Sequence, residues 1–360
     1  MASICLNMIV KNETRVIKRC LDSVRPFIHH WVIVDTGSTD GTQELIRREL
    51  ADIPGELHER PWQNFGANRS EALRLAKGKA DYVLIIDADE ELEVPPGFSM
   101  PELRADQYML LHRRKDWPDT AWELGTLVKS ALPWRYQGVL HEVILCDAPH
   151  DMQLLTGPLV WGHFDSARNV DPAIKYGNDA RILEEALISE PDNARYVFYL
   201  AQSYRDAGQP DAAITAYERR AKMGGWEEEV YYSLYQVGAL AEGRGWEWSR
   251  VLDAYLRAYG SRPCRAEPLW ACAVHYRCAS EWPQAELFAR AAAAIPRPKD
   301  LLFVDDGVYK WRALDELAIA AYWLNKRDEA RQINERLLSE GHVPESERPR
   351  IQKNLAFSLA

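Results

Sequence analysis

The sequence predicts an α/β domain with a mostly parallel sheet, followed by an all-α domain built from helical repeats. Two observations support this prediction. Strand-like apolar runs alternate with helical patterns through the first third of the 360 residues. Beyond Asp171 the apolar residues follow helical spacing throughout. We therefore expect two domains, residues 1–168 and residues 169–360.

The N-terminal part contains both kinds of element in alternation. Short apolar runs predict strands over residues 3–10, 31–34, 82–86, 107–112, 124–130 and 158–164. Helical spacing of apolar residues predicts helices over residues 16–24, 42–50 and 68–77. Residues 92–101 hold three prolines and a glycine, so we expect a loop there.

The C-terminal part carries a repeat signal. Residues 191–217 resemble a tetratricopeptide repeat, with small residues at the helix crossings and Gly208 at the turn between the helices. Weaker, irregularly spaced copies at residues 253–255, 284–286 and 328–331 mark further second helices. We expect four imperfect repeats and a final helix near residues 347–358, stacked into a superhelix with a concave face. The tryptophans of this half are expected to pack between helices, or to form a platform for a ligand.

Composition excludes some classes of protein. A net charge of −10 argues against a dedicated nucleic-acid binder, which usually presents a basic face. No run approaches the roughly 18 apolar residues of a membrane span. The six cysteines form no Cys-x-x-Cys pair, so reduced thiols and a cytoplasmic location are expected.

A predicted buried strand ends abruptly in carboxylates. The apolar run Tyr82 to Ile86 is followed by Asp87, Asp89, Glu90 and Glu91. Alternation in an extended chain makes Asp87 and Asp89 project to the same side. Such a pair suits Mg²⁺ or Mn²⁺ with substrate phosphates completing the shell, although acidic residues also occur at solvated strand ends.

A second predicted strand ends in Asp35 and is followed by a glycine-bearing turn. Asp40 fits a helix N-cap with Gln43 as its capping-box partner, and that helix start offers free N–H groups to an anion. A well-capped connection without a ligand is the alternative. The spacing of Gly37 and Gly41 matches neither the dinucleotide-binding fingerprint nor a P-loop.

Four segments in this order resemble the family 2 glycosyltransferases of the GT-A fold. They are residues 3–13, 32–42, 65–69 and 87–90, and the resemblance covers roughly the first 165 residues. It implies that Asp35 contacts the nucleoside of a nucleotide sugar. It also implies that Asp87 and Asp89 bind the diphosphate through Mn²⁺ or Mg²⁺.

The resemblance extends to further donor contacts. Arg69 is expected to contact the sugar nucleotide, and its neighbour Ser70 departs from the Asn that many members carry. The remaining residues expected at the donor belong to the matching motifs and are Asn12, Glu13, Gly37 and Ala88. Family habit makes a UDP-sugar the expected donor.

Similar enzymes often carry a Gly-x-x-His-Glu segment near the site, here ending in His141 and Glu142. Glu142 is the candidate base, with Glu90 and Glu91 as rivals. His141 is expected to orient Glu142, to bind the diphosphate or to cap a strand. Leu145 stands where a zinc-protease motif needs His. His163 is expected to complete the metal shell, or else to be a structural histidine.

These expectations together describe a metal-dependent, inverting glycosyltransferase. A protein or peptide is the first acceptor expected, a glycan the second, and the helical repeats are also able to mediate homo-oligomerisation. A nucleotidyltransferase would ordinarily need a Gly-rich, basic phosphate loop, which residues 9–13 do not supply. A non-catalytic repeat adaptor with a degenerate nucleotide-sugar-binding domain is the other alternative, and the intact Asp-x-Asp pair argues against it.

Overall fold

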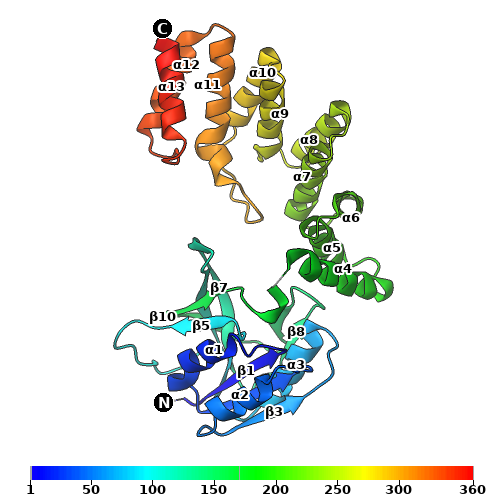
Figure 1. The fold of residues 1–360 in the computed structure, drawn as a ribbon, viewed down its shortest axis with the longest axis vertical. Coiled ribbons are helices and arrows are strands. Elements are labelled where there is room, and N and C mark those ends of the chain that lie inside the picture. Colours follow the sequence, from blue (N-terminus) through cyan, green and yellow to red (C-terminus); the bar gives the residue numbers. More distant parts are fainter. Residues whose placement is uncertain (1, 170, 360) are drawn as a thin grey trace. The chain divides into compact units, whose positions relative to one another are not determined.

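The computed structural model describes residues 2–169 and 171–359, with the side chains of residues 117–120 left out. The chain folds as two compact units, Met1–Ala186 and Leu187–Ala360. Both appear in Figure 1, and each is described by itself. The sequence-derived boundary at residues 168/169 lies just before the helix in which the first unit ends.

The N-terminal unit is built on an eight-stranded sheet of order β3-β2-β1-β4-β7-β6-β10-β5, with a separate two-stranded ribbon β8-β9. The sheet strands are β1 Ile4–Val10, β2 His30–Asp35, β3 Gly55–Glu59, β4 Tyr82–Ile85, β5 Glu90–Glu93, β6 Gln107–Arg114, β7 Trp117–Lys129 and β10 Met152–Gly162. The ribbon strands are β8 Trp134–Gln137 and β9 Val143–Cys146.

Parallel pairing dominates the first half of the sheet. Strand β1 pairs in parallel with β2 and β4, and β2 pairs in parallel with β3. Strand β7 runs antiparallel to both β4 and β6, while β6 and β10 are parallel. The predicted α/β fold class is therefore confirmed, and its carboxyl edge at β1, β2 and β4 is where a ligand site is expected.

Alternating residues of β1 face two different layers, as the pleat requires. Ile4, Leu6 and Met8 pack with apolar residues of α1 Ile17–Val24 and α2 Thr42–Glu49. Cys5, on the opposite face, packs with α3 Phe65–Ala76 and the ribbon. Helices therefore cover both faces of the parallel strands, as predicted for an alternating β–α sequence.

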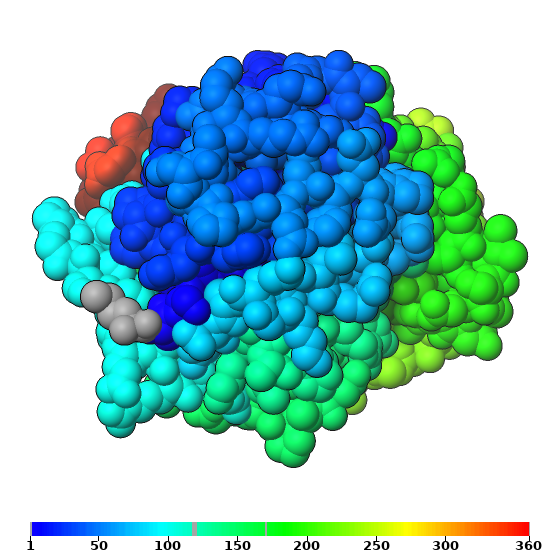
Figure 2. Space-filling model, turned by 90° about the horizontal axis from the view of Figure 1, so that it is seen from below, coloured from blue at the N-terminus to red at the C-terminus, as the bar shows by residue number. Residues whose placement is uncertain are grey.

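The remaining helical segments of the first unit are the 3₁₀ turns η1 Arg25–Phe27 and η2 Ala167–Asn169 and the helix α4 Pro172–Ser189, which runs on into the second unit. Figure 2 shows one face of the molecule, where blue and light blue side chains of the early segments adjoin cyan ones from near residue 100. Within the described residues, no helix combines the length and apolar character that crossing a bilayer demands.

The C-terminal unit is helical throughout its described length. Its helices are α5 Ala194–Asp206, α6 Pro210–Lys222, α7 Glu227–Gly243, α8 Trp248–Ser261, α9 Glu267–Cys278, α10 Trp282–Ala293, α11 Ala313–Trp323, α12 Arg327–Ser339 and α13 Arg348–Leu359, with a π-helical turn η3 Val308–Arg312 before α11. Consecutive helices pair from α5/α6 to α11/α12, followed by α13, which confirms the predicted repeats and final helix (Figure 1).

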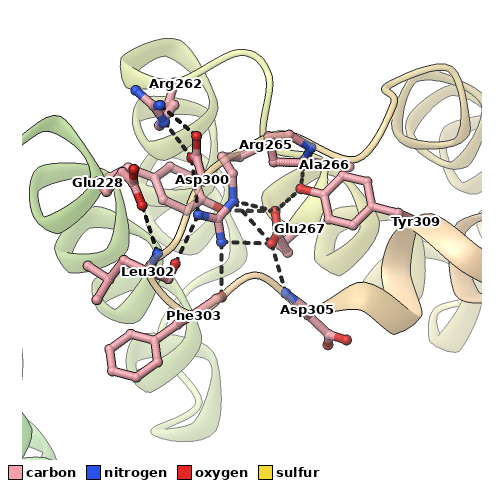
Figure 3. Close-up of polar contacts among 12 residues, drawn as sticks. Glu228, Arg262, Arg265, Ala266, Glu267, Asp300, Leu302, Phe303, Asp305 and Tyr309 are labelled. Carbon is pink, nitrogen blue, oxygen red and sulfur yellow. Dashed lines mark hydrogen bonds and ion pairs between the residues drawn. The ribbon is translucent and has the colours of Figure 1, made fainter. Parts of the chain in front are cut away.

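A buried ion network joins the segment between α10 and η3 to α7 and α9. Figure 3 shows Arg265 at its centre, with Glu267 and Asp300 as its carboxylate partners. The Arg265 guanidinium also donates to the backbone oxygens of Leu302 and Phe303, at 3.1 and 3.0 Å. Arg265 is 1% exposed, so this network is part of the core of the C-terminal unit.

The sequence missed four strands. Residues 92–101 were expected to be loop, but β5 occupies Glu90–Glu93 and pairs antiparallel with β10. The sequence of β5 is mostly acidic, so it carries no apolar strand pattern. The strand forms because it pairs with the free edge of β10. Strand β3 is likewise a polar edge strand, and β8 and β9 form a short ribbon outside the main sheet. Tertiary pairing overrides weak strand propensity in all four.

Candidate active site

A pocket of about 470 Å³ lies beyond the carboxyl ends of β1 and β4. The motif residues Glu13, Arg69, Asp87, Asp89 and Glu142 all line it. A second cavity of about 460 Å³ shares five lining residues with it, which are Ile9, Glu13, Phe65, Arg168 and Asp179. The two cavities therefore adjoin, with a volume of about 460 Å³ in one and about 470 Å³ in the other.

The carboxylates after β4 are positioned by a turn. The chain leaves β4 at Ile85, and the Glu90 N–H then donates to the Asp87 carbonyl oxygen at 3.0 Å. The Asp87 N–H in turn donates to Glu90 Oε2 at 2.9 Å. The predicted reason for Asp87 and Asp89 pointing together, an extended strand, is therefore wrong. The turn brings both of them, with Ala88 between, to the same pocket.

Glu90 itself is directed into the protein. Its Oε1 lies 3.5 Å from Nδ1 of His112, a histidine that is 2% exposed on β6. Burial, only partly offset by His112, raises the pKa of Glu90. The Glu90 carboxylate therefore stabilises the Asp87–Asp89 turn, because it accepts the Asp87 N–H.

Arg69 on α3 links two predicted site residues. One terminal guanidinium nitrogen donates to both carboxylate oxygens of Asp87, at 2.7 and 2.8 Å. Its Nε lies 2.7 Å from Glu142 Oε1. Burial disfavours the charged guanidinium, but the charges of Asp87 and Glu142 outweigh burial and raise the pKa of Arg69. Arg69 is therefore held as a fixed cation between two carboxylates.

The loop between β8 and β9 brings His141 and Glu142 to the pocket. Gly138 has φ of +110° and His141 has φ of +50°, so the loop turns sharply on left-handed residues. The Glu142 side chain is 12% exposed, and both residues line the pocket. The structure thus gathers Arg69, Asp87, Asp89, His141 and Glu142, which lie far apart in the sequence.

The carboxylate oxygens of Asp87 and Asp89 are suitable ligands for a hard divalent cation. Burial and the neighbouring charge of Asp87 raise the pKa of Asp89, and a cation would relieve that repulsion. Among the described residues, no three His, Cys, Asp or Glu side chains are arranged to hold a metal ion. Two carboxylates with phosphate and water oxygens would make up the shell, as is usual for Mg²⁺.

His163 lies beside this turn. Its ring Nε2 is 2.9 Å from Glu91 Oε2, and its backbone N–H donates to the Asp89 carbonyl oxygen at 3.1 Å. The pair of His163 and Glu91 therefore joins β10 to β5. Metal ligation by His163 stays a prediction, and it would require the ring to leave Glu91.

Thr36, directly after β2, lines the second cavity together with Asn12 and Glu13, whereas Asp35 and Gly37 are not among its lining residues. Asp35 is fully buried, and its Oδ1 accepts hydrogen bonds from the N–H groups of Gly37 and Ser38 at 2.9 and 2.8 Å. Its Oδ2 has no hydrogen-bond partner among the described residues. Asn12 holds the loop from the other side, because its Oδ1 accepts from the Thr39 N–H at 2.8 Å. Asp35 and Asn12, both expected at the donor, therefore bind the same loop.

Asp40 differs from its predicted role. The helix α2 begins after Gly41, whose φ is +92°. Asp40 accepts from the hydroxyl groups of Thr42 and Thr14 at 2.6 and 2.7 Å. Gln43 accepts from Arg47 instead of closing a capping box, so that part of the prediction is wrong.

Glu13 stands on the wall that the two cavities share. Burial raises its pKa to about 7, helped by the charges of Asp89, Asp40 and Asp87 and opposed by the Ala167 N–H. The carboxyl group is therefore poised between its neutral and charged forms near neutral pH.

Sequence reasoning missed the residues that close the pocket on its far side. Arg114 on β6, Arg168 and Asn169 on η2, and Lys175 and Tyr176 on α4 also line it. Asn169 Nδ2 lies 3.4 Å from Asp89 Oδ2. Arg168 and Lys175 follow the last predicted strand, residues 158–164, where the motif resemblance had ended, and Arg114 follows the strand predicted over residues 107–112.

Comparison with known proteins supports the motif assignment. Residues 5–95 match the family model described as Glycosyl transferase family 2. The resemblance expected from the sequence is confirmed for this segment, which carries Asp35, Arg69, Asp87 and Asp89.

Similar curated proteins match different lengths of the chain. A TPR repeat-containing protein of Synechococcus elongatus is 28% identical over 72% of this chain and 66% of its own length. The SPbeta prophage-derived glycosyltransferase SunS of Bacillus subtilis is 32% identical over 24% of this chain and 20% of its own. The lipopolysaccharide core biosynthesis glycosyltransferase LpsC of Rhizobium meliloti is 32% identical over 27% and 36%. This chain thus spans only part of each relative.

Solved structures show only distant likeness. MamA matches 49% of this chain and 92% of its own with 19% identity and a TM-score of 0.38. TarS of S. aureus matches 68% of this chain and 53% of its own with 12% identity and a TM-score of 0.37.

Proposed function

We propose that this chain is a metal-dependent glycosyltransferase. Its N-terminal unit contains the segment that matches family 2 glycosyltransferases, and a TPR-like helical array follows in the sequence. The observation that carries the proposal is the convergence of Arg69, Asp87, Asp89 and Glu142 on one pocket at the carboxyl edge of parallel strands. Two carboxylates and a buried cation beside a cavity suit a nucleoside diphosphate whose charge is shared with a divalent ion.

The donor would lie across both cavities. The nucleoside would occupy the cavity lined by Asn12, Glu13 and Thr36, the residue that follows Asp35 in the chain. The diphosphate would then reach Asp87 and Asp89 in the adjoining pocket. We take UDP as the nucleotide, on family resemblance.

The chemistry requires a base and a stabilised leaving group. Mn²⁺ or Mg²⁺ held by Asp87 and Asp89 would supply positive charge to the departing diphosphate. Glu142 would accept the proton of the acceptor hydroxyl as that oxygen attacks the anomeric carbon from the side opposite the diphosphate, which inverts the configuration. Arg69 would hold Glu142 and Asp87 in a fixed relation.

The helical repeats suggest which kind of acceptor the enzyme would use. Helical repeat arrays present extended concave surfaces, which suit a chain-like acceptor. We take a protein or peptide as the first candidate and a glycan as the second. The same surfaces would also suit self-association.

A repeat adaptor is the second candidate function. It is favoured by the relative from Synechococcus elongatus, whose printed name refers to its repeats and which matches 72% of this chain. An adaptor would keep the fold without metal-dependent binding of a nucleotide. The two candidates therefore differ in one measurable property.

Thermal melting of the full chain with UDP, GDP, CDP and dTDP, each with Mn²⁺, Mg²⁺ or EDTA, tests the proposal. A ligand that binds only the folded state raises the melting temperature. At a free concentration one hundred times its Kd, it adds about 2.7 kcal/mol to the free energy of unfolding. We expect one nucleotide to do so with metal and not with EDTA. Asp89→Asn should lose this shift while its own melting temperature stays near that of the wild type. No shift with any nucleotide would favour the adaptor.

A further inference from the structure

One wall of the pocket is basic and lies outside the segment that matches the family model. Arg114, Arg168 and Lys175 reach the pocket from β6, η2 and α4. They line the same cavity of about 470 Å³ as Asp87 and Asp89. Three cations around one cavity repel one another unless each finds an anion.

The two arginines have carboxylate partners within the protein. Arg114 binds Asp116 through two nitrogens, at 2.9 and 2.6 Å, and stacks over the Phe164 ring. Arg168 is paired with Asp179, and its guanidinium carbon lies 4.6 Å from the centre of the Phe65 ring. Both side chains are therefore held in place without a ligand.

Lys175 differs from both. Its Nζ lies 5.0 Å from the centre of the Tyr176 ring, and among the described residues no carboxylate forms a hydrogen bond or ion pair with it. The residue is half-buried, and burial together with the charges of Arg168 and Arg114 lowers the pKa of its ammonium group, although the charges of Asp179 and Asp89 oppose this shift. It stands in the first turn of α4, an 18-residue helix whose N-terminal end carries partial positive charge.

We propose that Lys175 is a substrate-binding residue of this site and takes a phosphate oxygen that enters the pocket. An ammonium group that lacks a carboxylate partner, in a pocket that two fixed guanidinium groups and Asp89 also line, is complementary to a phosphate bound in that pocket. The inference rests on the proposed glycosyltransferase function, because it assigns the phosphate to a substrate of that reaction.

Two substrates are able to bring the phosphate. It belongs either to the diphosphate of the donor or to a phosphate group carried by the acceptor. The donor arm of the experiment measures Kd by titration calorimetry for UDP, GDP, CDP and dTDP and for the corresponding nucleosides, with Mn²⁺. The acceptor arm measures inhibition of donor hydrolysis by glycerol 3-phosphate.

The variants are Lys175→Met, Lys175→Arg and the control Lys77→Met, a change at an exposed lysine that follows α3. For a donor phosphate, Lys175→Met should weaken binding of the nucleoside diphosphate about tenfold, the usual value of a charged hydrogen bond. Binding of the nucleoside should be unchanged. Lys175→Arg should restore most of the affinity, and Lys77→Met should match the wild type.

For an acceptor phosphate, the Kd of the nucleoside diphosphate should be unchanged in Lys175→Met. Inhibition by glycerol 3-phosphate, present in the wild type, should then be lost. Wild-type behaviour of Lys175→Met in both arms would overturn the inference. If no nucleoside diphosphate binds the wild type, it is the proposed function that fails.

Stability separates binding from folding. Because Lys175 has no carboxylate partner among the described residues, Lys175→Met should melt at the wild-type temperature or above it when no ligand is present. A variant that melts several degrees lower and loses nucleoside and diphosphate affinity together would mark Lys175 as structural and would overturn the inference.

Discussion

At the scale of single residues, Ser70 shows how a departure from a motif acquires a structural role. Its hydroxyl accepts the Tyr136 N–H at 2.9 Å and lies 3.3 Å from the Tyr136 carbonyl oxygen. Ser70 follows Arg69 on α3, and its two hydrogen bonds therefore connect α3 to β8. This places the strand that leads to His141 and Glu142 next to the helix that carries Arg69.

We predict that Ser70→Ala lowers the free energy of unfolding by about 1–2 kcal/mol, because the Tyr136 N–H loses its partner. Urea unfolding measures this change. Ser339→Ala, at an exposed serine, is the matched control and should stay within about 0.5 kcal/mol of the wild type. Equal values for the two variants would contradict the role given to Ser70.

The carboxyl group of Glu13 predicts a pH dependence. Burial raises its pKa to about 7, while the unfolded chain releases this proton near pH 4.5. The folded state therefore binds more protons between these values, and the ionisation lowers stability as the pH rises through that window. Glu13→Gln lacks this ionisation. It should match the wild type at pH 4 and be more stable by about 1 kcal/mol at pH 8, allowing for partial solvent screening.

Urea unfolding of both proteins at pH 4 and pH 8 checks the Glu13 prediction. A difference between them that is the same at both pH values would show that Glu13 does not titrate in this window.

The site residues were predictable from the sequence only where a motif marks them. Asp35, Asp87 and Asp89 follow apolar strands, so their place at the sheet edge could be foreseen. Arg69 sits on a helix and would otherwise pass for a surface residue, because its burial depends on Asp87 and Glu142. Lys175 carries no motif, so only the folded chain reveals its position.

At the scale of elements, the start of α3 depends on a close contact with the loop after β8. A Cβ atom on Gly66 would stand 2.1 Å from the Gly138 carbonyl oxygen, which is backbone and cannot move aside. Helix and loop therefore approach as closely as glycine allows. The same loop carries His141 and Glu142 to the pocket.

We predict that Gly66→Ala lowers the free energy of unfolding by at least about 2 kcal/mol, because helix and loop must separate. Gly177→Ala is the control. It lies within α4 with nothing within 4 Å of the added methyl group, so it should stabilise the protein by about 0.5–1 kcal/mol. Chemical unfolding of both variants gives the comparison, and a stable Gly66→Ala would refute the close contact.

The segment between α10 and η3 depends on the Arg265 network of Figure 3. Arg265→Met would leave Glu267 and Asp300 buried with less compensation, so we predict a loss of about 3–5 kcal/mol. Arg244→Met breaks an exposed pair with Asp211 and should change stability by less than about 1 kcal/mol. Urea unfolding followed by circular dichroism measures this change, because the signal comes mainly from the helices of the C-terminal unit. Similar values for both variants would mean that the network is not structural.

Elements with strong internal signals were predicted well. The strands β1, β2 and β4 are apolar throughout, and the helices of the C-terminal unit follow regular spacing. The polar strands β3 and β5 could not be recognised, since they form by pairing with a neighbour's free edge. The π-helical turn η3 before α11 likewise has no sequence signal that we identified.

At the scale of the whole molecule, the chain combines an α/β unit with a unit of paired helices. The family model covers residues 5–95, which hold the donor motifs. The loop with Glu142 and the basic wall with Lys175 come later in the chain. Glu142 and Lys175 therefore lie outside the segment that matches the family model, although they line the same pocket as Asp87 and Asp89.

The measurement that tests the central claim most directly is release of the nucleoside diphosphate from UDP-, GDP- and dTDP-sugars by the full chain, with Mn²⁺ and with EDTA. We predict release from one donor class with Mn²⁺, no release with EDTA, and a rate at least about a hundredfold lower in Asp89→Asn at an unchanged melting temperature. The same rate in EDTA or in Asp89→Asn, or no release from any donor, would contradict a metal-dependent glycosyltransferase.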